Sequence, residues 1–294
     1  MKISIVIPCW NSKKQLEDNI PFVLSDRPDE IIVVDDASED SSVHFLKEKY
    51  PQIKIIQNQY NKNFAFTVNR GVSQAKHELI CILNADVRPH KNYLKNAIKY
   101  FKDQNVFGVT LHELGNGPSI SDFRRGFIGY KKGKEKAMLG KSFWLSGGSC
   151  IVRKNIWEKL NGFDAQLFPF YWEDLDISYR AAKRGFELLW IPDSVVEHRH
   201  ETYYKQKYTA EYLSLQKEVR QLLFIWKNLT DGSLFILHIL GLLARVIKSP
   251  GYIKIVLLAM RKIPSVYQKR KIEIKESKIS DKLVLEAASG KGQQ

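Results

Sequence analysis

The chain has 294 residues, 44% of them hydrophobic, and carries a formal net charge of +14. This length suffices to bury a full core, so either one large domain with an appendage or two small domains are expected. No apolar run reaches the roughly 18 residues of a transmembrane helix, and Pro8 interrupts the apolar N-terminus too early for a signal peptide.

Most of the positive charge lies in the C-terminal third. Residues 199–294 contain 18 Lys and Arg against 8 Asp and Glu. Such a segment is attracted to an anionic partner, either a membrane surface or a nucleic acid. We predict no nucleic-acid partner, because the basic residues alternate with long apolar runs. The three cysteines lack metal-ligand spacing and predict buried, reduced thiols in a reducing compartment.

Strands and helices are predicted to alternate over the first 85 residues. The predicted strands are 3–7, 30–34, 54–56 and 79–83, and helices follow Ser12, Ser42 and Phe64. This order favours a mainly parallel sheet flanked by helices. Asn84-Ala85-Asp86 ends the fourth strand, at the edge where open α/β sheets bind ligands. The alternative is that Asp86 only caps the following helix.

The pattern changes after that strand. A helix over 91–101 and a strand over 106–111 precede a long segment with Arg124-Arg125 and Lys131–Lys134, interpreted as a solvated basic loop or as a lid that meets phosphates. Gly147-Gly148 stands in an apolar stretch and indicates either a bulge or close approach of a ligand to the backbone. A helix is predicted to start at Glu173, where acidic residues also suit the helix dipole.

Beyond Tyr203 the sequence predicts helices, of which 234–244 and 252–260 are nearly all apolar and flanked by Lys and Arg. We expect them to lie in a membrane interface, with a membrane contact over 233–275. The alternative is a helical hairpin packed on the catalytic domain or on a partner chain. The expected domains are 1–200 and 201–286, followed by a disordered tail over 287–294.

Five motifs in order resemble those of a family-2 glycosyltransferase with the GT-A fold, similar to rhamnosyltransferase-like members, and the resemblance covers residues 2 to about 200. They are Ile3–Asn11, Ile32–Ser38, Asn61–Ala75, Asn84–Asp86 and Gly162–Asp164 with Trp172–Asp174. Two positions depart from the pattern. Asn84 replaces the first Asp of the D-x-D motif, and Asn63 replaces a Gly whose left-handed conformation Asn tolerates.

The resemblance implies an inverting enzyme that uses Mn²⁺ or Mg²⁺, held by Asp86 and His198. It implies Asp174 as the general base, with Glu173 orienting the acceptor or the helix and Asp176 in a structural role. The implied nucleotide-binding residues are Pro8, Trp10, Asn11, Asp35, Asp36, Asn69 and Asn84, with Asp36 on a ring N–H of the base and Asp35 on the ribose side. Those implied for the donor sugar or the acceptor are Gly147, Gly148 and Trp172.

The implied substrates are a nucleotide-diphosphate sugar and a glycan or lipid-linked acceptor, used in cell-surface polysaccharide synthesis at the cytoplasmic face of the membrane. Two rival interpretations remain open. One is a retaining or polymerising enzyme of the same fold. The other is a nucleotide-sugar-binding or scaffold protein with a degenerate site, to which Asn84 points. The sequence leaves the oligomeric state open.

Overall fold

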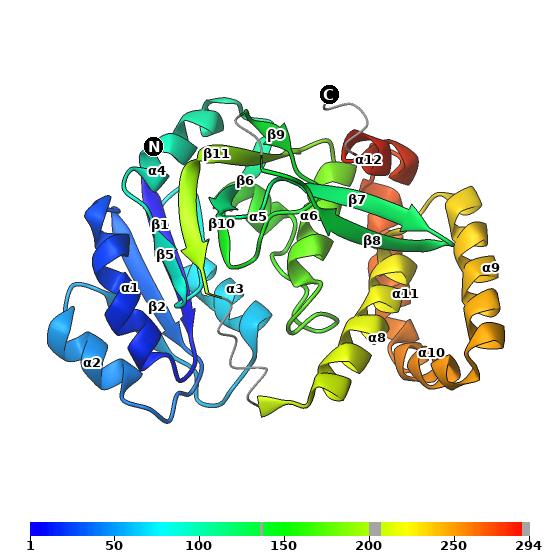
Figure 1. Cartoon of the computed structure of the whole chain (residues 1–294), viewed down its shortest axis with the longest axis horizontal. Helices are drawn as coiled ribbons and strands as arrows, with labels where there is room; N and C mark the ends of the chain where they lie inside the picture. The colour runs from blue at the N-terminus through cyan, green and yellow to red at the C-terminus, as the bar shows by residue number, and fades with distance from the viewer. Residues whose placement is uncertain (136–137, 200–206, 290–294) are drawn as a thin grey trace.

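The computed structural model describes residues 1–135, 138–199 and 207–289. A large central sheet with helices on both faces occupies one side of the molecule, and a helical region with a β-hairpin occupies the other (Figure 1). The predicted fold class, a mixed and mainly parallel sheet flanked by helices, is confirmed. We expected the strand-helix alternation of residues 1–85, and it is present.

The central sheet has nine strands in the part of the chain that the structure describes. They are β1 (Ile3–Cys9), β2 (Glu30–Asp35), β3 (Lys54–Gln57), β4 (Leu79–Leu83), β5 (Val87–Pro89), β6 (Val106–Glu113), β9 (Gly140–Lys141), β10 (Ser149–Arg153) and β11 (Glu187–His198). Their order is β3-β2-β1-β4-β10-β6-β11-β5, and β9 pairs with β11. The first four in this order are parallel to one another.

Helices cover both faces of this sheet, because its buried strands are apolar on both sides. These helices are α1 (Lys13–Ser25), α2 (Ser42–Lys49), α3 (Phe64–Gln74), α4 (Tyr93–Ile98), α5 (Lys154–Lys159) and α6 (Glu173–Lys183). One core contains Ile5 of β1 with side chains of α1, α2 and α4. The other contains Val6 with side chains of α3, α5 and α6.

The antiparallel strand β10 assembles the centre of the molecule. It lies between β4 and β6, and Ser149 pairs with Leu83. The loop that enters β10 therefore meets the loop that leaves β4, and the N–H of Asn84 donates to the carbonyl of Gly148 (2.8 Å). Two segments some 65 residues apart in sequence thus share one edge of the sheet.

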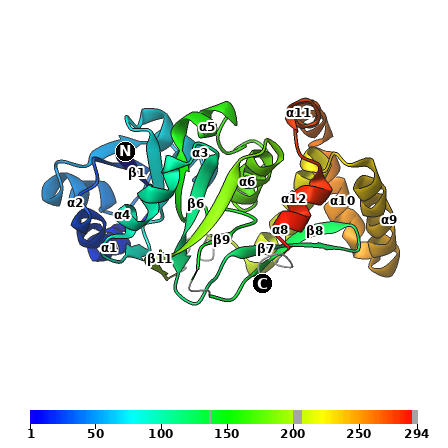
Figure 2. The same cartoon turned by 90° about the horizontal axis from the view of Figure 1, so that it is seen from above.

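The basic segment that we expected to be a long loop forms a β-hairpin, β7 (Ser119–Arg124) and β8 (Phe127–Lys132). Its turn packs against α9 (Gly232–Lys248), on the side of the molecule away from β1 and β2 (Figure 2). Gly126 at this turn has φ +81°, and a Cβ there would come within 2.3 Å of the carbonyl oxygen of Leu237. Because the tip of this hairpin packs against α9, we do not keep the interpretation of the segment as a lid that meets phosphates.

The C-terminal helices share a third core with the hairpin and α6. Besides α9 they are α8 (Ala210–Asn228), α10 (Ile253–Met260), α11 (Ile263–Glu276) and α12 (Asp281–Ala287). Buried ion pairs join them to α6, since Lys183 meets Asp281 (2.7 Å) and Asp176 meets Lys227 (2.8 Å). The predicted domain boundaries stay a prediction, and the end of the predicted tail, 290–294, lies outside the described residues. Within the described ranges, no helix is long and apolar enough to cross a membrane.

Candidate active site

The loop after β4 places Asn84 and Asp86 at one end of the sheet, next to the last residue of β11. Asp86 is buried, and one of its carboxylate oxygens lies 3.3 Å from Nε2 of His198. Strand pairing fixes this contact, because His198 is the register partner of Val87 in β5. The two residues that the resemblance implied as metal ligands are therefore neighbours, although 112 positions separate them in the sequence.

Glu113, the last residue of β6, is a member of the site that the sequence did not reveal. Its Oε1 lies 3.0 Å from Nδ1 of His198 and accepts hydrogen bonds from the hydroxyls of Ser146 (3.0 Å) and Ser149 (2.7 Å). A carboxylate on the second nitrogen of a metal-binding histidine typically fixes the ring orientation. Its signal was a carboxylate at a strand end, as for Asp86, but no motif marks it.

His198 and the two carboxylates shift each other's pKa values. Burial alone would lower the pKa of His198, but the hydrogen bonds and charges of Asp86 and Glu113 raise it to about 9. Burial would raise the pKa of Glu113, yet its hydrogen bonds to His198 and the two serine hydroxyls lower it to about 2. The site thus favours a positive charge next to Asp86, which is the electrostatic requirement of a cation site.

The donors at Asp86 and His198 fit a hard divalent cation. Two ligands at adjacent corners of an octahedron with bonds of about 2.1 Å lie about 3 Å apart, close to the 3.3 Å between Asp86 and His198. Residues 1–135, 138–199 and 207–289 contain no group of three His, Cys, Asp or Glu side chains that could hold a metal ion by themselves. A cation here would therefore need ligands from a substrate phosphate.

Gly147 and Gly148 separate this cluster from Asp174 at the start of α6. A Cβ at Gly148 would lie 2.5 Å from Nδ2 of Asn84 and 3.0 Å from Cε1 of His198. A Cβ at Gly147 would lie 3.2 Å from Cβ of Asp174. The two missing side chains thus let a loop of backbone pass between an acidic helix terminus and the Asp86–His198 pair.

Glu173 and Asp174 differ in environment although they are adjacent. Asp174 accepts hydrogen bonds from the N–H groups of Gly147 (3.2 Å) and Leu175 (2.8 Å). Burial raises the pKa of Asp174 to about 6, against the lowering effect of these N–H groups. Burial and the charge of Asp174 raise the pKa of Glu173 well above its ordinary value. Burial therefore favours the protonated form of Glu173, whereas the two backbone N–H groups favour the ionised form of Asp174.

The two residues before this helix terminus, Tyr171 and Trp172, have an unusual backbone conformation. Trp172 and Tyr171 adopt positive φ, 73° and 57°, immediately before α6. Such backbone is strained for aromatic residues and persists only where the surroundings impose it. The ring of Trp172 packs on Phe224 of α8, 5.2 Å between centroids. The helical region thus helps to set where α6 begins.

The predicted nucleotide-binding residues fall into two groups. Asp35 is buried at the end of β2; Oδ2 accepts the N–H of Ser38 (3.3 Å), whereas Oδ1 has no hydrogen-bond partner among the described residues. Asp36 accepts from the backbone N–H groups of Lys62 (2.8 Å) and Asn63 (2.9 Å) and from Nδ2 of Asn58 (2.6 Å). Asp35 can therefore meet a nucleotide base, while Asp36 holds the loop before α3.

The remaining predicted residues lie mostly at the same sheet edge. Pro8 and Trp10 are half-buried at the end of β1, and the Lys207 ammonium lies 4.3 Å from the Trp10 ring centroid. Oδ1 of Asn11 accepts the N–H of Glu39 (2.7 Å), so this side chain shapes the loop after β2. Asn69 does not belong to this group, because both polar atoms of its side chain form hydrogen bonds with the backbone of Phe163.

The comparisons with known proteins show the family and the fold of this chain. The model of glycosyl transferase family 2 matches residues 4–160, more than half of the chain. The chain belongs to glycosyl transferase family 2. This family-2 glycosyltransferase is 26% identical over 215 residues to the O-antigen chain rhamnosyltransferase RfbN of Salmonella typhimurium, covering 68% of this chain and 67% of RfbN.

Two solved structures share its GT-A fold. One is GalNAc-T7 with UDP, GalNAc and Mn²⁺, with a TM-score of 0.66 and 17% identity; the match covers 79% of this glycosyltransferase and 48% of that chain. The other is the mannosyltransferase PcManGT from Pyrobaculum calidifontis with GDP-Man and Mn²⁺, with a TM-score of 0.56, 16% identity, and coverage of 99% and 87%. At these identities the likeness establishes the fold alone.

Proposed function

We propose that this chain transfers a sugar, with inversion, from a nucleotide-diphosphate donor to a glycan or lipid-linked acceptor in cell-surface polysaccharide synthesis. The observation that carries the proposal is the position of Gly147-Gly148. These residues bring Asp174, whose pKa is about 6, to one side of the same backbone segment that contacts Asn84 and His198 on the other. A base and a diphosphate site on either side of a sugar are what single displacement requires.

The donor would lie with its base at the ends of β1 and β2. Oδ1 of Asp35 would accept a ring N–H of the base, while Pro8 and Trp10 would line it. Asn84 can offer a neutral oxygen to the ribose or to the cation. We do not assign Asp36 or Asn69 to the base, because the hydrogen bonds described above occupy their side chains.

Asp86 and His198 would hold Mn²⁺ or Mg²⁺, and Glu113 would fix the ring of His198. The bound cation would neutralise the charge that develops on the leaving diphosphate. GalNAc-T7 and PcManGT, which share the fold, were both solved with Mn²⁺. Metal ligation requires the imidazole to give up its second proton, so cation binding at this site should release protons.

The transfer itself balances in one step. The acceptor hydroxyl oxygen forms a bond to the anomeric carbon, its proton passes to Asp174, and the bond from that carbon to the diphosphate oxygen breaks with its electron pair. With Asp174 opposite the diphosphate, the acceptor would attack from the far face and the configuration would invert. Proton transfer to a positioned base of this kind typically contributes 10²–10⁴-fold to the rate.

A thermal-shift screen of UDP-, dTDP- and GDP-sugars, with and without Mn²⁺, tests donor binding, since a ligand that binds only the folded state raises stability. We expect one nucleotide to stabilise the chain more with Mn²⁺ than without, and Asp86→Asn to abolish that difference. If no nucleotide sugar binds, the proposal is wrong. NMR of the product's anomeric configuration then decides between inversion and the retaining rival, and binding without turnover would support the non-catalytic rival.

The helical region would attach the enzyme to the inner face of the cell membrane. On α9 the apolar side chains of Ile236, Leu240, Leu243 and Ile247 follow one another at helical spacing, and Ile247 is 80% exposed. Four exposed basic residues lie at the end of α9, in α10 and directly after α10, namely Lys248, Lys254, Arg261 and Lys262. An apolar face accompanied by exposed basic residues fits an anionic lipid surface.

Pelleting with vesicles that contain anionic lipid tests this attachment. Leu240→Gln combined with Ile247→Gln should reduce pelleting strongly, and added salt should weaken it further. The matched control is Phe22→Gln, because Phe22 is an exposed apolar residue of α1, on the sheet side of the molecule (Figure 1). Equal pelleting of the wild type and the double variant would exclude this face as the membrane contact.

A further inference from the structure

An aromatic pocket lies beside the proposed base, Asp174. Its volume is about 110 Å³. Four aromatic residues and two acids line it: Tyr130, Trp144, Tyr171, Trp172, Glu173 and Asp174. Pockets for drug-sized ligands measure about 300–1,000 Å³, so this pocket has room for a single small ring.

The rings of Tyr130 and Trp144 form the accessible wall of this pocket. Their centroids are 4.2 Å apart with planes tilted by 53°, and Tyr130 is 50% exposed. The ammonium group of Lys217 covers Tyr171 instead, 4.5 Å from its ring centroid. The negative π face of an aromatic ring attracts polarised C–H groups, and one face of a sugar ring presents such groups.

The acidic wall of the pocket calls for hydroxyl groups. Oε2 of Glu173 is buried and has no hydrogen-bond partner in the described part of the chain. Burial raises the pKa of the Glu173 carboxyl well above its ordinary value and so favours the form that donates a hydrogen bond, whereas Asp174 beside it can accept one. Burial and the charges of Asp174 and Glu173 also raise the pKa of Tyr130 to about 12, so its phenol stays a donor.

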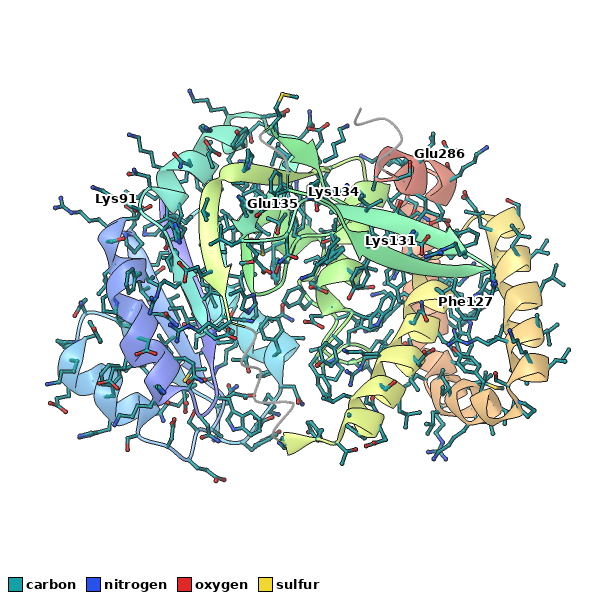
Figure 3. The ribbon with its side chains drawn as sticks, viewed as in Figure 1. Lys91, Phe127, Lys131, Lys134, Glu135 and Glu286 are labelled. Atoms are coloured by element: carbon teal, nitrogen blue, oxygen red, sulfur yellow. The ribbon has the colours of Figure 1, made fainter. Side chains whose placement is uncertain are left out.

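The hairpin that carries Tyr130 is held in place at its far end. In α9, Nδ1 of His238 donates to the carbonyl of Gly126 (2.8 Å), and Nε2 accepts from Nε1 of Trp226 (3.0 Å). Phe127 lies beside α9 at this tip, with its ring centroid 5.3 Å from that of His238 (Figure 3). Tyr130 is therefore presented by a pre-positioned strand and not by a loose loop.

We propose that this pocket binds the acceptor as one pyranose ring, seated on Tyr130 and Trp144 with adjacent hydroxyls at Asp174 and Glu173. This inference rests on the proposed function and specifies its acceptor. The hydroxyl at Asp174 is the nucleophile, and the hydroxyl at Glu173 fixes the orientation of the ring. The acceptor is accordingly a sugar with neighbouring hydroxyls, whatever chain or lipid that sugar carries.

Intrinsic tryptophan fluorescence tests the pocket directly, because Trp144 and Trp172 line it. The protein is first saturated with Mn²⁺ and the nucleoside diphosphate that stabilises it most. It is then titrated with methyl pyranosides of glucose, galactose, mannose, rhamnose and N-acetylglucosamine. We expect at least one to change the fluorescence saturably, Tyr130→Ala to weaken its binding roughly tenfold, and Tyr130→Phe to retain most of the affinity.

Tyr267→Ala is the matched control, since Tyr267 on α11 is similarly exposed (58%) and lies outside the pocket. It should leave pyranoside binding unchanged. Absence of saturable binding by all five glycosides, or equal binding by the wild type and Tyr130→Ala, would overturn the inference. Nucleotide binding is measured in the same samples to distinguish the two proposals. If the protein does not bind nucleotide, the donor site is refuted; if it binds nucleotide but no glycoside, only the acceptor pocket is refuted.

Discussion

Two pairs of adjacent acids bound the active site, and in each pair the second acid receives most of the hydrogen-bond donors. At the end of β2, Asp36 takes three donors from the loop before α3, while one buried oxygen of Asp35 has no hydrogen-bond partner among the described residues. At the start of α6, Asp174 takes two backbone donors, and Oε2 of Glu173 likewise has no partner in the described part of the chain. The four carboxyl groups are therefore proposed to have four different roles.

The difference lies in what the donors do for each carboxylate. At Asp36 they engage both oxygens and tie the loop before α3 to the end of β2, so we assign this residue a structural role. At Asp174 they offset part of the cost of burial and bring the pKa to about 6, where the group is ionised and still basic. In the first pair the acid with fewer donors, Asp35, is the one proposed to meet the nucleotide base, whereas in the second pair both acids are proposed to meet the acceptor.

The largest effect is expected from Asp174→Asn. Turnover should fall by about 10²–10⁴, while nucleotide binding in the thermal-shift assay stays unchanged. The wild-type rate should rise with pH up to about 6 and level off above it, since only the deprotonated carboxylate accepts the proton. Near-normal turnover of the variant would contradict the assignment of the base.

Asp36→Ala should have the largest effect on stability. It leaves two backbone N–H groups and the Asn58 amide without their acceptor, and each buried donor left unsatisfied costs about 1–3 kcal/mol. We expect urea unfolding to show a loss of about 3 kcal/mol or more. Asp35→Ala serves as the comparison and should lose less. If the two variants were equally destabilised, the structural role given to Asp36 alone would be wrong.

Asp35→Asn should act on binding and leave stability nearly unchanged. A hydrogen bond to a charged group contributes about 1.5–3 kcal/mol, so affinity for the preferred nucleoside diphosphate should fall on the order of 10- to 100-fold by calorimetry. Inorganic diphosphate with Mn²⁺ is the control ligand, because it has no base, and its affinity should not change. A parallel loss for both ligands would place Asp35 away from the base.

The sequence predicted the sheet well because its signals are local. Apolar runs that end in Asp35-Asp36 or Asn84–Asp86 mark buried strands and their carboxyl edge. The role of Glu113 was not predicted, because it arises only when β6 lies next to β11 in the sheet. The hairpin of Tyr130 was taken for a loop, because its basic residues and glycines resemble a solvated segment and its packing partner, α9, lies more than 100 residues later. The resemblance implied Asp36 for the nucleotide base, and we propose Asp35 instead, because the donors that engage Asp36 come from a loop more than 20 residues away in the sequence.

The smallest effect is expected from Glu173→Gln, and it tests the protonated state of this acid. An amide of nearly the same shape still donates a hydrogen bond, so turnover should stay within about threefold of the wild type. The pH midpoint of the rate near 6 should also remain, because a neutral Glu173 exerts no charge on Asp174.

A carboxyl whose pKa is raised by folding binds its proton more tightly in the native state, so wild-type stability falls as pH rises above the unfolded pKa. The variant lacks this loss and should be at least as stable as the wild type at pH 7–8 by thermal unfolding. A clear drop in the rate midpoint of the variant would instead mean that Glu173 is ionised, and that its charge helps to make Asp174 a base.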